Sequence, residues 1–252
     1  MESKKKEEYF KTLKLIESIF PNTDSYLLEK TLENVMCTNL VNEFGEIIDW
    51  YNEQINKDNS EEKIISLKDL EGWNFNNSEF ISHESNAFFR IVGLQIRNQN
   101  SREILNTGWD QPIIQEKNNV GGLLGLLRTK INGLPHYLIE AKYEPGNYNK
   151  ILLSPTLQAT FSNINRAHGG RTPNYYDFFS DHEESSNYLF NNWLTEDGGR
   201  LYKKRNLALV KEVAYNDLEI KEGFILISLY QVKYLLKNYS IVNPHLARLI
   251  FL

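Results

Sequence analysis

Charged and polar side chains suited to acid–base chemistry are concentrated in the middle of this chain. In the strand-like run 137–142, alternate residues share one face, so Glu140 and Lys142 lie side by side. Glu144 follows and begins a turn made by Pro145 and Gly146. Such charges can line a cleft, where carboxylates act as bases and lysines stabilise anions. An exposed ion pair has the same pattern, and periodicity alone leaves both interpretations open.

A row of neutral polar residues falls in the segment 154–160. Thr156, Gln158 and Thr160 share one face if this segment is extended. These side chains can hydrogen-bond a sugar, but a solvent-facing strand often has the same sequence. The pattern alone therefore leaves a sugar-binding strand and an ordinary surface strand as alternatives.

Two common kinds of site are not indicated. Gly121, Gly122 and Gly125 lack the lysine of a phosphate-binding P-loop, and we predict that they form a tight turn entering a helix. The five histidines have no zinc-binding spacing, and Cys37 is the only cysteine. We therefore predict no metal site and no cofactor-binding motif of these kinds.

Composition narrows the class of protein. The 252 residues carry a formal net charge of −5, and the only dense basic run is 4–6, so the charge pattern argues against nucleic acid as a partner. No apolar stretch near the start resembles a signal peptide or a membrane span. With a single cysteine, the chain fits a reducing compartment, and we predict a cytoplasmic protein without membrane contact.

Hydrophobic periodicity predicts an α+β fold in two parts. Apolar residues at helical spacing between positions 7 and 51 predict about three helices, followed by a polar connector at 56–62. We assign residues 1–60 to an N-terminal helical arm and residues 61–252 to the main module. Within that module, the sequence predicts strands at 88–96, 137–141, 151–153 and 207–213, and helices at 226–236 and 242–250.

The polar segments of the middle third, taken together, resemble the NDP-4-keto-6-deoxyhexose 2,3-dehydratases. They occur in the family's order and cover about half of the chain, which makes the set far more specific than any one motif. The matching segments are Ile81-Ser82-His83 followed by Phe88-Phe89; Trp109-Asp110-Gln111-Pro112; Glu140-Ala141-Lys142-Tyr143-Glu144-Pro145-Gly146-Asn147; Ser154-Pro155-Thr156-Leu157-Gln158-Ala159-Thr160 with Ser162-Asn163; and Lys203-Lys204-Arg205-Asn206.

This resemblance implies a Nudix-like mixed sheet flanked by helices and a specific reaction. A nucleotide-linked 4-keto-6-deoxyhexose, with a dTDP-sugar favoured, would lose the C3 proton and the C2 hydroxyl to give a 3,4-diketo-2,6-dideoxysugar. The C4 ketone acidifies the C3 proton, so no redox cofactor is required.

Well-known family members carry two modules in one chain. This sequence has room for one, which implies a homodimer.

The resemblance also implies roles for individual residues. The base would be Glu144 or Glu196, Lys142 would steady the enolate, and His83 is a candidate acid. Arg90, Lys204 and Arg205 would meet the diphosphate, and Trp109 and Gln111 the nucleobase or sugar. The remaining predicted substrate contacts are neutral polar residues: Asn147, Thr156, Gln158, Thr160 and Asn163. As alternatives, Trp109 anchors a turn, and Arg205 pairs with Glu196 or Glu212.

Two departures from known patterns affect the function. The family's Gln-Ser-Glu-Gln-Gly stretch is replaced here by Leu194-Thr195-Glu196-Asp197-Gly198, which keeps the glutamate and the glycine. This change leaves a non-catalytic nucleotide-sugar binding subunit as an alternative function. A Nudix-type hydrolase is a weaker alternative, because the chain lacks the Arg-Glu and Glu-Glu signature that holds magnesium in those enzymes.

Overall fold

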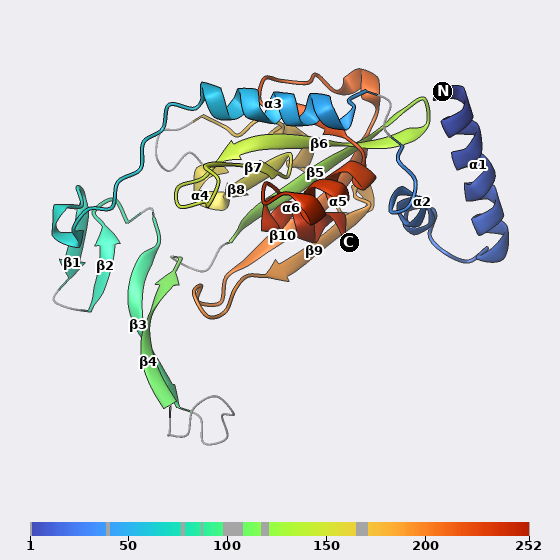
Figure 1. The fold of residues 1–252 in the computed structure, drawn as a ribbon. Coiled ribbons are helices and arrows are strands. Elements are labelled where there is room, and N and C mark those ends of the chain that lie inside the picture. Colours follow the sequence, from blue (N-terminus) through green and yellow to red (C-terminus); the bar gives the residue numbers. More distant parts are fainter. Residues whose placement is uncertain are drawn as a thin grey trace.

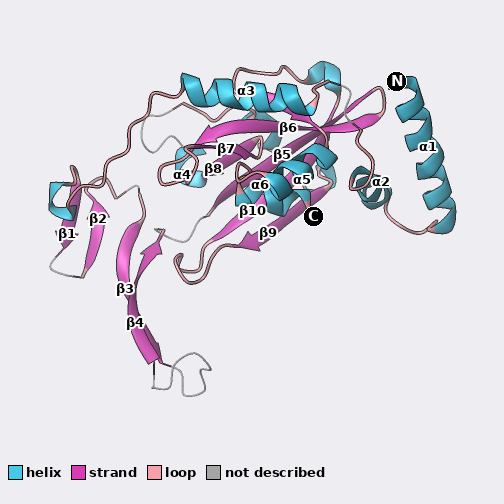
Figure 2. Ribbon diagram, in the orientation of Figure 1, coloured by secondary structure: helices cyan, strands magenta, loops and turns pink. Residues whose placement is uncertain are grey.

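The computed structural model describes residues 2–38, 41–76, 79–86, 88–97, 108–116, 121–164 and 171–251. A seven-stranded mixed sheet forms the body, helices cover it, and a separate four-stranded sheet projects from one end (Figure 1). Helices and strands both contribute substantially to the described chain (Figure 2). The predicted α+β class is confirmed. No helix in the described ranges is long and apolar enough to cross a lipid bilayer.

The large sheet is built around two long, buried strands. Its order is β11-β6-β5-β10-β9, with β7 paired to β6 and β8 paired to β5. Strands β5 and β10 are parallel, and the other pairs are antiparallel. The strands are β5 (Gly122–Ile131), β6 (Leu134–Tyr143), β7 (Ile151–Ser154), β8 (Leu157–Thr160), β9 (Phe190–Thr195), β10 (Arg205–Val213) and β11 (Phe224–Ile227).

Strands β5 and β6 form a fork, which opens space for a site. They pair with each other from Leu127 and Leu138 to the hairpin turn. Beyond that point they diverge, and β7 pairs with β6 while β8 pairs with β5. Thr156 lies at the apex, where its hydroxyl accepts a hydrogen bond from Leu127 N at 2.9 Å and donates one to Leu138 O at 2.5 Å. These bonds satisfy backbone groups that the divergence leaves without strand partners.

Both faces of the central strands of the large sheet are buried. Helices α3 (Phe44–Lys57), α5 (Leu229–Asn238) and α6 (Pro244–Ile250) cover one face, with Ile47, Val232 and Leu246 in its core (Figure 1). On the opposite face, Tyr175 and Phe179 pack against the odd-numbered leucines of β5. They belong to the segment 171–188, which contains two short 3-10 helices, Tyr176–Phe179 and Ser185–Asn187. Burial on both faces explains the nearly continuous apolar sequence of this strand.

The glycine-rich stretch was predicted wrongly as a turn entering a helix. Gly122 and Gly125 lie within β5. A Cβ atom at Gly125 would lie 2.6 Å from the Phe179 ring, and one at Gly122 would lie 2.5 Å from Ala159 O. Glycine is therefore required by close packing inside the sheet, a reason that local sequence does not reveal.

Other sequence predictions of secondary structure were largely confirmed. The described part of the first 57 residues contains three helices, α1 (Glu2–Ile19), α2 (Ser25–Glu33) and α3, and the four predicted strands correspond to β3, β6, β7 and β10. The predicted helix at 226–236 begins later, because residues 224–227 form strand β11. A short apolar run is compatible with a buried strand or a buried helix, so periodicity could not separate them.

Helices α1 and α2 form their own small core, which includes Tyr9, Leu13, Leu28 and Leu32 and rests on Leu134 of β6. Helix α3 instead contributes Ile47 and Tyr51 to the core of the large sheet. The boundary at residue 60 stays a prediction, although α3 packs with the main module.

The small sheet consists of β1 (Trp73–Asn76), β2 (Phe80–His83), β3 (Arg90–Arg97) and β4 (Gly108–Gln115) in antiparallel order. Its attachment to the body is through the base of β4. There Ile114 N donates to Arg200 O at 3.0 Å, and Tyr202 N donates to Ile114 O at 2.8 Å. These bonds place the base of the small sheet beside the loop that leads into β10.

Candidate functional site

A cavity of about 320 Å³ lies at the open end of the fork. Its lining comes from β5, β6, β8, α4 (Phe161–Ile164), β10, α6 and the loop between β9 and β10. Seven of the predicted site residues meet here: Lys142, Glu144, Gln158, Thr160, Asn163, Glu196 and Lys204. The cavity is completed by Leu123, Leu124, Ala159, Leu201, Asn206 and His245.

Glu144 is held at the cavity by the turn that follows it. Asn147 N donates to Glu144 O at 3.3 Å, and Gly146 has φ +85°, which glycine adopts without steric cost. The carboxylate accepts two amide hydrogen bonds, from Gln158 Nε2 at 2.6 Å and from Asn243 Nδ2 at 2.9 Å. Both oxygens are therefore engaged, and the carboxylate has a fixed orientation.

Glu196 is the centre of a second polar network. Its side chain is only 5% exposed and accepts hydrogen bonds from Asn206 Nδ2 at 2.6 Å and from Arg248 Nη1 at 2.9 Å. His245 Nδ1 lies 3.5 Å from Glu196 Oε1. Burial lowers the pKa of His245; Glu196 opposes this shift, whereas Arg248 adds to it. The network therefore places His245, whose lowered pKa favours the neutral imidazole, beside a buried carboxylate.

Two lysines bring positive charge to the cavity. Lys142 Nζ lies 3.3 Å from Glu140 Oε2, and Lys204 pairs with Glu116 at the end of the small sheet. Burial raises the pKa of Glu140, and Lys142 opposes that shift. The Glu140–Lys142 pair confirms that these residues share a strand face. It also lines the second cavity, and its two side chains are only 25% and 23% exposed, so the alternative of an exposed ion pair does not apply.

A second cavity of about 350 Å³ adjoins the first and shares Lys142 and Gln158 with it. Its lining also includes Arg171, Asn174 and Phe224. Gln158 Oε1 is buried and has no hydrogen-bond partner among the described residues. A residue that both cavities share therefore carries a buried acceptor without a partner in the described chain.

Four predicted site residues lie on the small sheet, outside both cavities. His83 packs against Phe88 with ring centroids 4.7 Å apart, and its Nδ1 is 2.8 Å from Ser85 Oγ. Arg90 Nε donates to Gln115 Oε1 at 2.8 Å. Trp109 Nε1 donates to Gln111 Oε1, and Gln111 Nε2 donates to Gly199 O, each at 2.8 Å. The structure therefore does not bring these four together with the cavity residues.

Three other predicted residues have contacts of their own. Arg205 lies over the Trp193 ring at 4.4 Å and, among the described residues, has no ion pair with Glu196 or Glu212. Asn147 is in the turn after Glu144 and does not line the first cavity. Thr156 uses its hydroxyl at the fork apex and reaches only the second cavity.

Sequence reasoning did not identify Asn206, His245 and Arg248 as site residues. Asn206 was part of the motif 203–206 but received no role. In the helix at 244–250, Leu246, Leu249 and Ile250 are buried, whereas His245 and Arg248 are three residues apart on another face. A histidine and an arginine on one face of a short apolar helix were the available signal.

Within the described part of the chain, His, Cys, Asp and Glu side chains form no cluster of three that could hold a metal ion.

A family model described as NDP-hexose 2,3-dehydratase matches residues 44–251, a range that contains both sheets and both cavities. Three curated relatives are named dTDP-4-dehydro-6-deoxy-alpha-D-glucopyranose 2,3-dehydratase. The one from Saccharopolyspora spinosa is 35% identical over 195 residues, covering 77% of this chain and 39% of the relative. Those from Streptomyces violaceoruber and Amycolatopsis orientalis are 36% and 30% identical, covering 70% and 71% of this chain. They are covered to 39% and 38%, so the chain spans about two fifths of the length of these relatives.

Proposed function

Because this chain belongs to the NDP-hexose 2,3-dehydratase family, we propose that it removes water across C2 and C3 of a nucleotide-linked 4-keto-6-deoxyhexose. A dTDP-sugar is the favoured substrate, since the names of the three relatives specify one. The enzyme would be a hydro-lyase without a redox cofactor. Loss of the C3 proton and of the C2 hydroxyl gives an enol, which tautomerises to the 3,4-diketo-2,6-dideoxysugar.

The observation that carries this proposal is the convergence of Lys142, Lys204, Glu144 and Glu196 on one cavity. Its volume of about 320 Å³ is within the range of small-molecule sites. Removing the C3 proton places negative charge on the C4 oxygen, and an ammonium group stabilises that charge most strongly in a site that excludes water. Lys142, next to the polar row of β8, is the residue we assign to this role.

The two carboxylates fit positioning better than proton abstraction. Both oxygens of Glu144 and both oxygens of Glu196 already accept N–H hydrogen bonds. Taking a proton from carbon would require one of these bonds to break. Their amide and guanidinium partners would also be left without acceptors, which is costly in a partly buried site.

The second cavity is our candidate for the nucleotide end of the substrate. It carries Arg171, and it shares Lys142 and Gln158 with the first cavity. Arginine binds phosphate oxygens through two parallel hydrogen bonds, so Arg171 suits the diphosphate. A substrate that occupies both cavities would place its sugar beside Glu144 and Glu196 and its phosphates beside Arg171.

The test is incubation of the purified chain with dTDP-4-keto-6-deoxyglucose, without added metal, together with a 3-ketoreductase that traps the unstable product. We expect mass spectrometry to detect a reduced sugar that has lost one water. Magnesium-dependent release of a nucleoside monophosphate would indicate a hydrolase instead. Tight binding without turnover, for several nucleotides, would indicate a binding subunit.

We also propose that the chain acts as a homodimer, the state that the family resemblance implies for one module. Light scattering should then give twice the 29.5 kDa of a single chain at micromolar concentration. A mass equal to one chain would contradict this.

A cytoplasmic location is proposed on the basis of the single cysteine.

A further inference from the structure

We propose that His245 carries the proton in this dehydration, taking it from C3 and delivering it to the departing C2 hydroxyl, and that Glu196 positions the imidazole ring. The inference rests on the proposed function and adds a catalytic residue to it. His245 comes from helix α6, about 50 residues after Glu196 in the sequence.

The surroundings of Nδ1 favour Nε2 as the ring nitrogen that meets the substrate. His245 Nδ1 is buried, lies 3.5 Å from Glu196 Oε1 and has no hydrogen-bond partner among the described residues. A carboxylate at this distance favours a proton on Nδ1, which leaves the lone pair on Nε2. The residue lines the first cavity, and 23% of its side chain is exposed. Because Nδ1 is buried, we infer that the unprotonated Nε2 is the nitrogen that a substrate meets.

Glu196 is held independently of any ligand. Asn206 and Arg248 bind its two oxygens at 2.6 Å and 2.9 Å. Asn206 belongs to a central strand and Arg248 to the same helix as His245, so the carboxylate is held by the sheet and by the helix that carries the histidine. It acts through the imidazole and is a positioning residue, as carboxylates are behind many histidine bases.

The proton balance closes within the site. The C3–H bond breaks, the proton goes to Nε2, and the electron pair forms an enolate whose oxygen faces Lys142. The imidazolium that results is stabilised by Glu196. The C2–O bond then breaks, the enolate electrons form the C2=C3 double bond, and the imidazolium gives its proton to the leaving oxygen. Water departs, the histidine is neutral again, and no oxidant or reductant is needed.

The pH profile gives a readout that a structural role would not change. The charged groups facing His245 are Glu196 and Glu144, which raise its pKa, and Arg248 and Lys204, which lower it; burial lowers it most. A base must be unprotonated, so kcat/KM should fall on the acid side, below the ordinary histidine pKa of about 6.5. The substitution Glu196→Gln removes a charge that raises the pKa, so it should move this acid limb to lower pH.

The decisive experiment is His245→Ala, assayed with dTDP-4-keto-6-deoxyglucose with and without added imidazole. We expect kcat/KM to fall by about 10²- to 10⁴-fold, the usual range for a lost general base. Free imidazole should enter the space of the missing ring and restore part of the lost kcat/KM. His182→Ala is the matched control, because His182 lines neither cavity and bonds to Phe179 O through Nδ1.

Circular dichroism and thermal melting establish that each variant is folded. A folded His245→Ala variant within about threefold of the wild-type kcat/KM would overturn the inference, as would a loss that imidazole does not restore. An unchanged acid limb in Glu196→Gln would also overturn it. Failure of the proposed function is distinguishable, because then the wild-type chain itself would not dehydrate the substrate.

Discussion

Replacing Lys142 by methionine is expected to lower kcat/KM for the proposed dehydration by about 10²- to 10³-fold, the cost typical of losing one donor to a developing oxyanion. Lys142 lines both cavities, and its partner Glu140 belongs to the same strand face. Since the enolate charge exists only in the transition state and intermediate, kcat and kcat/KM should fall together. Steady-state kinetics with the trapping reductase measures both parameters.

Lys150→Met is the control for Lys142→Met. Lys150 lies on the loop after the turn at 145–146, is about half exposed, and interacts with Asp58 and Ser60 O. It lines neither cavity, so its removal should leave kcat/KM within about threefold of wild type. If Lys142→Met raised KM without lowering kcat, the lysine would bind the substrate without stabilising the enolate, and our assignment would be wrong.

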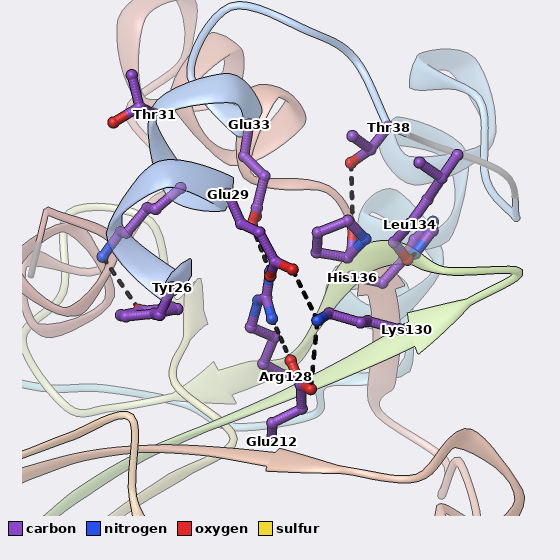
Figure 3. Close-up of polar contacts among 12 residues, drawn as sticks. Tyr26, Glu29, Thr31, Glu33, Thr38, Arg128, Lys130, Leu134, His136 and Glu212 are labelled. Carbon is purple, nitrogen blue, oxygen red and sulfur yellow. Dashed lines mark hydrogen bonds and ion pairs between the residues drawn. The ribbon is translucent and has the colours of Figure 1, made fainter. Parts of the chain in front are cut away.

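Replacing Arg128 by methionine should destabilise the fold by about 3–5 kcal/mol, the usual cost of removing one partner from a buried charge cluster. Arg128, in β5, is 1% exposed and lies between glutamates from α2 and β10 (Figure 3). Its Nη2 is 2.5 Å from Glu29 Oε2 and 2.7 Å from Glu33 Oε1, and its Nη1 bonds to Glu212. Glu33 is fully buried, so it cannot exchange the lost guanidinium for water.

The destabilisation should depend on pH with a defined sign. Burial raises the pKa of Glu33, and Arg128 opposes that shift. Without Arg128 the pKa rises further. A glutamate with a raised folded-state pKa favours folding in its neutral form, and this contribution is lost as the pH rises through that pKa. Urea denaturation should therefore give a smaller difference between wild type and Arg128→Met at about pH 5 than at about pH 7.5.

Two variants test the reason for the Arg128 effect. Lys130→Met removes a neighbouring cation that is 34% exposed and pairs with Glu29 at 2.8 Å, so it should cost at most about 1 kcal/mol. Adding Glu33→Met to Arg128→Met removes the stranded carboxylate and should recover much of the lost stability. A double variant no more stable than Arg128→Met would mean that packing, rather than the unpaired charge, sets the cost.

The charge cluster around Arg128 also connects the N-terminal helices to the large sheet, a contact that the sequence did not predict. Glu29 and Glu33 belong to a helix that precedes the range of the family match, whereas Arg128 and Glu212 belong to the central strands of the large sheet. The first two helices of the predicted N-terminal arm therefore contact the sheet through these ion pairs as well as through the apolar contact with Leu134.

Local geometry was predictable where one segment alone determines it. The alternation in 137–142 placed Glu140 and Lys142 on one face, and Pro145 with Gly146 predicted the turn that holds Glu144. The alternation also placed Gln158 and Thr160 together, and both line the first cavity. These successes have a common cause, because strand and turn conformations follow from the backbone angles of a few adjacent residues.

The resemblance added residues that local patterns could not. It selected Glu196 and Lys204, which line the cavity, but it also selected His83 and Trp109, which lie on the projecting sheet. The order of motifs shows which segments occur together in a family. The distance in space between residues of different motifs depends on how the two sheets are placed. Sequence reasoning therefore could not separate cavity residues from those on the small sheet.

By itself, the sequence determined the α+β class, most of the strands and helices, and the local faces that carry Lys142, Glu144 and Gln158. Only the tertiary structure decided which of these faces enclose a site. Strands β5 and β6 diverge around Thr156, whose hydroxyl replaces the lost strand bonds, and a cavity opens beyond that point. Burial of Leu246 and Leu249 then holds the last helix against the sheet, which brings His245 to Glu196 across about 50 residues of chain. Such contacts depend on the packing of distant apolar faces, which no short window of sequence encodes.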